Sequence, residues 1–335
     1  MDLPKLTHYV KIICTLFERF EQQRMKVKEA KSGSQYTYSE QGFIVFFLLM
    51  QFRRKYQFKS QWRWLTHHPE MVTLLGWEGV PHRKTISTRY KGLYETLQAF
   101  MMFCAQYTTE LNEAFGLSHL VEDKSLFKAL GPVWHQSDRL ENRIPDKLRH
   151  LDTEATWSKS GYHGWVYGFG LHLTCTQDAF PVLIQVETAN VSESQVVDQK
   201  AELILDQLQP ETLATDNSYA KALRIRRWAK RGVALLSPAY KWITGRYAKA
   251  YHRFINQPFY RDLLIGRRTS VEPCFDLIAK VLGTQAKQKQ LPVQRLDNVR
   301  SCLALASFSV QLAMIVNSIW GLPHRNVSHI YDAFS

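Results

Sequence analysis

The spacing of apolar residues divides the chain into two parts with different periods. Up to residue 116 the apolar positions recur at helical spacing, which predicts helices over 40–55, 59–68, 69–75 and 82–106. From residue 117 the apolar positions begin to alternate with polar ones, which is the period of a strand. The pattern therefore predicts an all-helical region at residues 1–116, followed by a region that contains a sheet.

In the second part, a run of strands gives way to alternating strands and helices. Strands are expected over 118–127, 166–176, 180–188, 212–215 and 233–237. Helices are expected over 192–208, 218–231, 269–282 and 296–320. This order is typical of an α/β domain in which a mixed sheet is covered by helices.

Three further segments complete the expected domain organisation. We expect the α/β domain to span 117–322 and a C-terminal tail to follow at 323–335. The stretch 128–165 is too long for a simple hairpin loop, so it predicts a basic insertion. The apolar run 301–320 is long enough to cross a membrane, but it contains six Ser, Gln and Asn residues. Those residues favour a buried core helix, and no membrane partner is expected.

Composition narrows the class of protein. Hydrophobic residues make up 45% of the 335 positions and charged residues 22%, which excludes a mainly disordered or collagenous chain. The formal net charge of +13 favours a polyanionic partner, either nucleic acid or an anionic membrane surface. The five cysteines are scattered and include no CxxC pair, which excludes a disulfide scaffold and favours a reducing cytosol.

Basic residues are concentrated in two segments. Between Asp216 and Asp262 there is no acidic residue, and the basic residues there are Lys221, Arg224, Arg226, Arg227, Lys230, Arg231, Lys241, Arg246, Lys249, Arg253 and Arg261. We interpret this segment, with its interleaved tyrosines and a tryptophan, as a surface that follows DNA phosphates. The alternative is an ordinary solvated helix and loop.

The second basic segment lies in the N-terminal region. Its basic residues are Arg83, Lys84, Arg89 and Lys91, interleaved with short Ser and Thr side chains. This composition suits the recognition helix of a helix-turn-helix unit, whose first residues face base edges or phosphates. A basic helix without a DNA-binding role is the alternative.

Three acidic residues lie where carboxylates can converge on a metal. Asp123 lies inside an apolar strand, Asp216 directly follows a short strand, and Glu272 belongs to a later helix. A carboxylate inside an apolar strand is costly unless it is paired or bound to a cation. Mg²⁺ and Mn²⁺ prefer oxygen ligands, and two such ions can activate the attacking oxygen and stabilise the leaving oxygen of a phosphodiester. Each position alone is more often a turn or surface residue.

Several motifs occur in a fixed order along the chain. They are Val80-Pro-His-Arg-Lys-Thr-Ile-Ser-Thr-Arg89, Asp123-Lys-Ser125, Gly131-Pro-Val-Trp-His135, Leu151-Asp-Thr-Glu-Ala-Thr-Trp157, Gly164-Trp-Val-Tyr-Gly168, Thr188-Ala-Asn-Val191, Thr215-Asp-Asn-Ser-Tyr219 and Arg268-x-x-Val-Glu272-x-x-Phe275. These segments resemble those of bacterial insertion-sequence transposases of the DDE class, and together they cover most of residues 40–320.

The resemblance implies a fold, a reaction and its partners. The catalytic domain is expected to be RNase H-like, with Asp123, Asp216 and Glu272 as a DDE triad that binds two Mg²⁺ or Mn²⁺ ions. Such an enzyme cuts DNA at the ends of a mobile element and transfers the strands into target DNA. The expected partner is therefore double-stranded DNA, and the expected location is the bacterial cytosol or nucleoid. Because two ends must be joined in concert, we expect a homodimer on DNA.

The resemblance also assigns phosphate-binding residues near the third acid. Arg268 matches the family's Arg four residues before the Glu, and Arg267 beside it is included in the same group. The family often has a Lys seven residues after the Glu, but this chain has Ala279 there. The neighbouring Lys280 is the candidate, although a shift of one residue turns a helical side chain by about 100°.

Two local questions concern the carboxylates. Pro273 disfavours helical geometry at Glu272 and is best tolerated in a first helical turn. We therefore expect Glu272 at a helix start, capped by Thr269 or Ser270, where the positive helix end favours its ionised form. Asp152 is the alternative first carboxylate, in a more loop-like setting than Asp123.

Two other functions compete with the transposase hypothesis. The chain can be a non-catalytic DNA-binding relative, which would not bind metal at the three acids. It can also be a different RNase H-like nuclease, which would cut DNA but would not join it.

Overall fold

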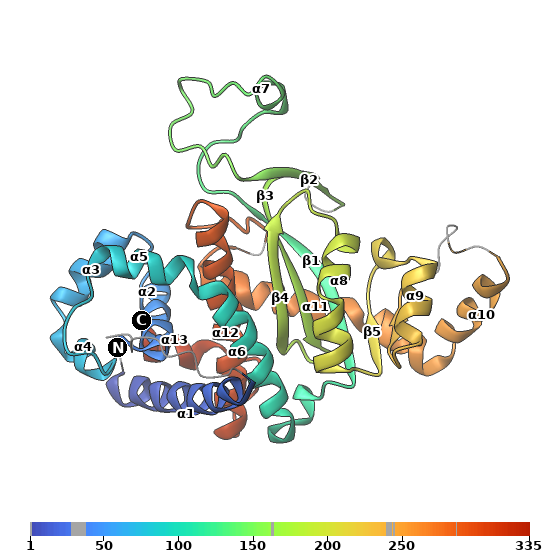
Figure 1. Ribbon diagram of the computed structural model, residues 1–335, viewed down its shortest axis with the longest axis horizontal. Coiled ribbons are helices and arrows are strands. Elements are labelled where there is room, and N and C mark those ends of the chain that lie inside the picture. The colour runs from blue at the N-terminus through green and yellow to red at the C-terminus, as the bar shows by residue number, and fades with distance from the viewer. Residues whose placement is uncertain (1, 28–37, 162–163, 239–242, 244, 286) are drawn as a thin grey trace. The chain divides into compact units, whose positions relative to one another are not determined.

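The computed structural model describes the chain except for residues 1, 28–37, 162–163, 239–242, 244 and 286 (Figure 1). The chain packs as two compact units. The first contains Met1–Cys104 and Asp297–Ser335, and the second contains Ala105–Leu296. The two units are defined by which residues pack together. They do not test the domain boundaries predicted at 116/117 and 322/323, which stay predictions.

The first unit is helical, as the apolar spacing predicted. Its helices are α1 (Leu3–Val27), α2 (Glu40–Phe52), α3 (Phe58–Thr66), α4 (Pro69–Leu74), α5 (Arg83–Lys91), α6 (Leu93–Tyr107), α12 (Leu296–Ile319) and α13 (Ser328–Phe334). The single helix expected over 82–106 is wrong, because Gly92 separates α5 from α6. The Gly92 N–H bonds to the Thr88 carbonyl and closes α5.

Helix α12 is the central helix of this unit. By length and composition alone it could cross a membrane, but 89% of its most apolar window is buried. Two of its polar side chains bond to the backbone of neighbouring helices: Ser301 Oγ donates to the Tyr90 carbonyl at 2.6 Å, and Gln311 Nε2 donates to the Met101 carbonyl at 2.8 Å. These bonds offset the cost of burying polar groups, as expected for a core helix.

The second unit is built on a mixed sheet. Its strands are β1 (His119–Lys128), β2 (Thr156–Ser160), β3 (Gly164–Thr176), β4 (Pro181–Thr188), β5 (Thr212–Ala214) and β6 (Ala234–Leu236). The order is β2-β3-β1-β5-β6, with β4 also paired to β3. Strand β3 is antiparallel to β1, β2 and β4, whereas β5 is parallel to both β1 and β6. The predicted α/β fold with a mixed sheet is confirmed.

The expected insertion at 128–165 contains structure that periodicity did not reveal. It holds the short helix α7 (Gln136–Leu140) and strand β2, which pairs with the first residues of β3. Figure 1 shows the segment that carries α7 reaching beyond the end of the sheet. Short elements with few apolar residues leave little periodic signal, so the sequence pattern missed both.

Helices cover both faces of the sheet or pack beside its β6 edge. They are α8 (Glu193–Gln199), α9 (Ala222–Ala229), α10 (Arg246–Ile255) and α11 (Pro258–Leu282), with 3₁₀ turns η1 (Thr109–Leu111), η2 (Glu113–Phe115) and η4 (Asn217–Tyr219), and a π-helical turn η3 (Leu203–Leu208). Figure 1 shows α8 in front of the strands and α11 behind them. Ser192 caps α8 as predicted, because its Oγ accepts the Gln195 N–H.

Neighbouring residues of β1 point to opposite faces of the sheet. On the α8 face, Glu122 is fully buried and accepts a hydrogen bond from Lys200 Nζ at 2.6 Å. Lys200 is 1% exposed and also donates to Thr174 Oγ1 on β3 at 2.7 Å. Because side chains alternate along a strand, Asp123 points to the opposite, α11 face. The buried Glu122–Lys200 pair therefore fixes which face of β1 presents Asp123.

We predict that Lys200→Met destabilises the protein by about 3–5 kcal/mol, because it leaves the Glu122 carboxylate buried without its partner. The double variant Glu122→Met with Lys200→Met removes both charges and should recover most of this loss. Denaturant unfolding of the three proteins measures the difference. Equal destabilisation by the single and double variants would contradict the buried-pair argument.

Candidate active site

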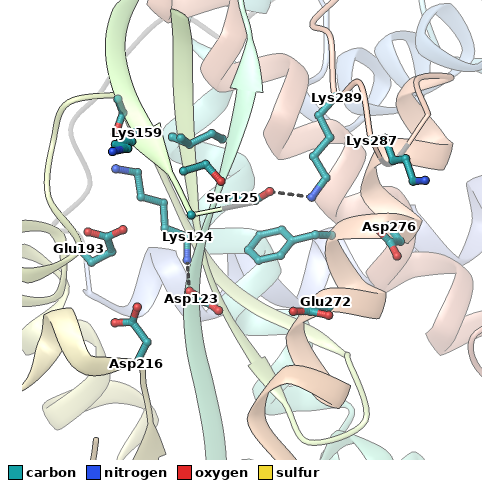
Figure 2. Close-up of a pocket in the computed structure, with 15 residues that line it drawn as sticks. Asp123, Lys124, Ser125, Lys159, Glu193, Asp216, Glu272, Asp276, Lys287 and Lys289 are labelled. Atoms are coloured by element: carbon teal, nitrogen blue, oxygen red, sulfur yellow. Dashed lines mark hydrogen bonds between the residues drawn. The ribbon is translucent and has the colours of Figure 1, made fainter. Parts of the chain in front are cut away.

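One pocket of the second unit contains the three acids that the sequence analysis selected. Asp123 lies within β1, Asp216 directly follows β5, and Glu272 lies on α11, and all three line this pocket. Figure 2 shows Asp216 on one side of Asp123 and Glu272 on the other. The remaining lining residues are Lys124, Ser125, Leu126, Ser158, Lys159, Ser160, Gly161, Glu193, Phe275, Asp276, Lys287 and Lys289. Strand pairing and helix packing thus bring together three residues that are 93 and 56 positions apart along the chain.

Asp123 is held by two contacts at the base of this pocket. Its Oδ2 pairs with Arg267 Nη1 at 2.7 Å, and its Oδ1 accepts the Lys124 N–H at 2.8 Å. Burial raises the pKa of Asp123 to about 6; Arg267 opposes this rise, and the nearby Asp216 and Glu122 charges add to it. A buried carboxylate that is costly to ionise gains most from a nearby cation.

Asp216 is ordered by the turn that follows β5. Its Oδ1 accepts the Ser218 N–H at 2.9 Å and the Ser218 hydroxyl at 2.6 Å, which makes Asp216 the cap of η4. Its backbone carbonyl accepts a hydrogen bond from the Ser237 hydroxyl beside β6. The two hydrogen bonds to Oδ1 therefore orient the Asp216 side chain. Among the described residues, none donates a hydrogen bond to its Oδ2.

Glu272 lies well inside α11, so the prediction that it begins a helix is wrong. The helix starts at Pro258 and continues through Pro273. Pro273 removes one backbone hydrogen bond, but the buried face of α11 packs Val271, Cys274 and Phe275 against the unit. This packing outweighs the local cost, so the positive end of a helix does not act on Glu272.

The same correction changes the geometry around Glu272. Because α11 is continuous, residues four apart share one face, and these are Arg268, Glu272, Asp276 and Lys280. All four are exposed. Glu272 and Asp276 line the pocket, whereas Arg268 and Lys280 do not. Arg267 is on the adjacent, buried side and reaches Asp123 instead.

Asp152, the alternative first carboxylate, lies outside this pocket. It lines a separate pocket with His150, Glu154 and Arg295 among others. Its Oδ2 accepts the Arg295 N–H at 2.9 Å, and its Oδ1 accepts the Glu154 N–H at 3.2 Å. Burial raises the pKa of its carboxyl group. These contacts tie the insertion to the segment that follows α11, which is a structural role.

The predicted recognition helix is α5. Ile86 and Tyr90 are buried within the first unit, whereas the side chains of Arg83, Lys84 and Lys91 are exposed. Arg89 differs from these three, because its guanidinium lies 5.5 Å from the centre of the Phe43 ring. Three of the four predicted basic side chains therefore face solvent and can meet DNA.

The second basic segment divides into structural and exposed residues. Arg224 is 4% exposed, and its guanidinium donates to the Asp198 carboxylate, to the Tyr219 carbonyl and to Ser194. Its expected role in DNA binding is therefore wrong, because its three guanidinium nitrogens are already occupied. Arg227 on α9 and Arg246 on α10 are exposed.

Lys241 lies outside the described residues, so its expected DNA contact stays a prediction. The described neighbours of this gap include a stacked pair. Arg226 lies over the Tyr247 ring at 4.0 Å and joins α9 to α10. Arg246 also lies over the Tyr247 ring, at 5.0 Å, and this cluster is at the surface because Tyr247 is 47% exposed.

The donors of the pocket fit a hard divalent cation. Five carboxylates line it, and oxygen ligands are those that Mg²⁺ and Mn²⁺ prefer. Within the described residues, no three carboxylate, His or Cys side chains are yet close enough to hold one metal ion together. One Asp123 oxygen faces Arg267, so metal binding there requires the carboxylates to draw together.

Some residues of the pocket were missed by the sequence analysis. Asp276 follows Glu272 by one helical turn, a spacing that would have identified it. Glu193 directly follows the predicted cap Ser192. Lys289 belongs to an irregular segment after α11, where no periodicity indicates the side-chain direction.

We predict that Asp123→Asn changes how stability depends on pH in the metal-free protein. Between pH 4 and 6 the folded protein keeps a proton on Asp123 that the unfolded chain releases, because the folded pKa is raised. Ionisation of the Asp123 carboxyl group therefore lowers the free energy of unfolding of the wild type as the pH rises, by up to about 3 kcal/mol once the pH exceeds 6. Relative to wild type, the variant should gain this amount between pH 4 and 7, as measured by denaturant unfolding in a chelator. A constant difference across this range would show that Asp123 does not titrate with a raised pKa.

Comparison with known proteins agrees with this site. A family model described as a transposase DDE domain matches residues 118–291, which is more than half of the chain and includes every residue that lines the pocket. Searches of curated proteins and of solved structures found no match. The match covers the sheet and its helices as far as the segment after α11. The chain belongs to the DDE transposase family.

Proposed function

We propose that this chain is an insertion-sequence transposase that cuts DNA at element ends and joins the ends to target DNA. The observation that carries the proposal is the shared pocket of Asp123, Asp216 and Glu272, which come from β1, the end of β5 and α11. The match to the transposase DDE domain spans all three residues, which supports the proposal.

The reaction has two steps at this one site. In the first, water attacks a phosphodiester at the element end, a new P–O bond forms, and the bond to the 3′ oxygen breaks to leave a 3′-hydroxyl. In the second, that hydroxyl attacks a target phosphodiester and displaces the target's own 3′ oxygen. Two bound Mg²⁺ or Mn²⁺ ions would lower the pKa of the attacking hydroxyl group and stabilise the leaving oxygen.

The chain's own residues would prepare the site for these ions. Asp123 and Asp216 would hold them between β1 and β5, and Glu272 would complete the set from α11. Arg267 now neutralises Asp123 at 2.7 Å, so we infer that it turns from this carboxylate when a cation arrives. Arg268, exposed one helical turn before Glu272, would bind a phosphate beside the acids.

Two exposed basic surfaces would bind the DNA outside the pocket. The first consists of Arg83, Lys84 and Lys91 on α5, which would enter a groove. The second consists of Arg227 and Arg246 on α9 and α10, which would follow phosphates without reading bases. Because two element ends must be joined in concert, we propose that two copies of the chain act together on DNA.

A non-catalytic DNA-binding protein is the second candidate. The observation that favours it is the absence of a preformed metal cluster among the residues that the structure describes. In that case the basic surfaces would bind DNA, and the Asp123–Arg267 pair would remain closed. Calorimetry with Mn²⁺ separates the candidates, since only the transposase should bind Mn²⁺ through Asp123 and Asp216.

An insertion sequence would carry an inverted repeat at each end, beside the reading frame. We predict that Asp216→Asn abolishes cleavage of a duplex with this flanking inverted repeat, assayed with Mg²⁺. DNA affinity should stay equal or rise, because one negative charge next to the phosphate is removed. Mn²⁺ binding should be lost in parallel. Strand transfer with pre-cut ends tests the joining step, which a nuclease that only cuts would fail.

The matched control is Asp262→Asn, which removes the same charge from an exposed position on α11 outside the pocket. It should cleave as wild type does. Cleavage by Asp216→Asn at the wild-type rate would refute the triad assignment.

We also predict that Lys84→Ala weakens DNA binding and lowers the slope of log affinity against log salt by about 0.9, since one phosphate contact is lost. Lys59→Ala serves as its control, because Lys59 is exposed on the neighbouring helix α3. Fluorescence anisotropy at several salt concentrations measures both slopes. Equal slopes for the two variants would exclude Lys84 from the DNA interface.

A further inference from the structure

A lysine outside the family-like motifs extends into the pocket of the three acids. Lys289 Nζ donates a hydrogen bond to Ser125 Oγ at 2.8 Å (Figure 2). Ser125 lies two residues beyond Asp123 on β1, so the two side chains point to the same face of the sheet. The contact therefore fixes the Lys289 ammonium on the Asp123 side of the sheet, where Glu272 also lies.

The backbone around Lys289 is held firmly enough to direct this side chain. The Lys289 carbonyl accepts the Lys128 N–H at 2.9 Å, and the Lys128 carbonyl accepts the Leu291 N–H at 2.9 Å. This pairing attaches the segment to the end of β1. Lys289 itself has a backbone φ of +42°, which residues other than glycine rarely adopt. Strain of this kind persists only where the surroundings impose it.

The ammonium group is only partly satisfied by the protein. It lies 5.3 Å from the centre of the Phe275 ring and 5.9 Å from that of Phe127. A lysine has three N–H donors, and Ser125 takes one of them. Within the described residues, no carboxylate lies within ion-pair distance of Lys289 Nζ. Donors thus remain for an anion that enters the pocket.

The electrostatic setting of Lys289 itself favours a direct anionic partner. Burial lowers the pKa of Lys289, and Asp276, Glu272 and Asp123 oppose this effect from a distance. A partly buried cation without a direct ion pair is costly, and a phosphate oxygen would give it a charged hydrogen-bond acceptor.

We propose that Lys289 binds a nonbridging oxygen of the DNA phosphate held at the three acids. The proposal rests on the transposase function proposed above and adds a phosphate-binding residue to it. Lys280, the lysine expected for this work, is exposed and does not line the pocket. Lys289 supplies the positive charge from the segment after α11 instead of from the helix. The rival role for Lys289 is that of a counterion for Asp276 and Glu272.

The test compares Lys289→Met, which keeps the length and packing of the side chain, with Lys289→Arg and wild type. DNA affinity is measured against salt with Ca²⁺, which supports binding without cleavage, on the duplex with the flanking inverted repeat. Lys289→Met should lower the slope of log affinity against log salt by about 0.9. Its single-turnover cleavage rate with Mg²⁺ should fall about 100-fold. Lys289→Arg should restore the slope and part of the rate.

The control is Lys128→Met. Lys128 pairs with Lys289 through its backbone, but its side chain is exposed and lies outside the pocket lining. The control variant should keep the wild-type rate and slope. Thermal melting of all variants checks that each is folded. An unchanged salt slope in a folded Lys289→Met would overturn the proposal and leave the counterion role.

The outcomes also separate this proposal from the proposed function. If Asp216→Asn abolishes cleavage while Lys289→Met cleaves as wild type does, the transposase function stands and the role of Lys289 is refuted. If Asp216→Asn cleaves normally, the triad assignment fails instead. The salt slope then still decides whether Lys289 contacts a phosphate, because it does not depend on cleavage.

Discussion

The alternation of side chains along β1 is the constraint on which the rest of the site depends. Glu122 is buried against Lys200 on one face, and Asp123 points into the acidic pocket on the other. A slip of one residue would bury Asp123 and expose Glu122, which would break a buried ion pair. The antiparallel pairing of β1 with β3 and its parallel pairing with β5 then align Asp123 with the turn that carries Asp216. The chain therefore specifies the pocket through strand register.

The pocket concentrates carboxylates, and positive side chains keep that arrangement tolerable in the free protein. Arg267 pairs with Asp123 directly, and Lys289 contributes its charge from beside Ser125 on β1. The raised pKa of Asp123 comes mainly from burial of its carboxyl group, and the neighbouring Asp216 and Glu122 charges add to it. A divalent cation would compensate the carboxylates, and a DNA phosphate would give the partly buried Lys289 a charged partner. The buried charges of the pocket therefore lower the stability of the free protein and, at the same time, provide its binding groups.

The sequence alone determined the class of fold and selected three acids that the structure brings to one pocket. The helical period before residue 117 and the alternation after it were confirmed as a helical unit and a mixed sheet. Asp123 and Asp216 could be found because each is next to apolar strand residues. A charge in such a setting is costly unless it is paired or bound to a cation. Local signals of this kind, such as the Ser192 cap, depend on neighbouring residues and can be read from the chain.

Only the tertiary structure decided the remaining features, because they depend on partners distant in sequence. Packing of Val271 and Phe275 carries α11 through Pro273 and moves Glu272 away from a helix start. Arg224 is occupied by Asp198, 26 residues before it, and Arg267 by Asp123, 144 residues before it. The contact of Lys289 with Ser125 spans 164 residues. A side chain's neighbours across such separations are set by strand register and helix packing, which no local pattern records.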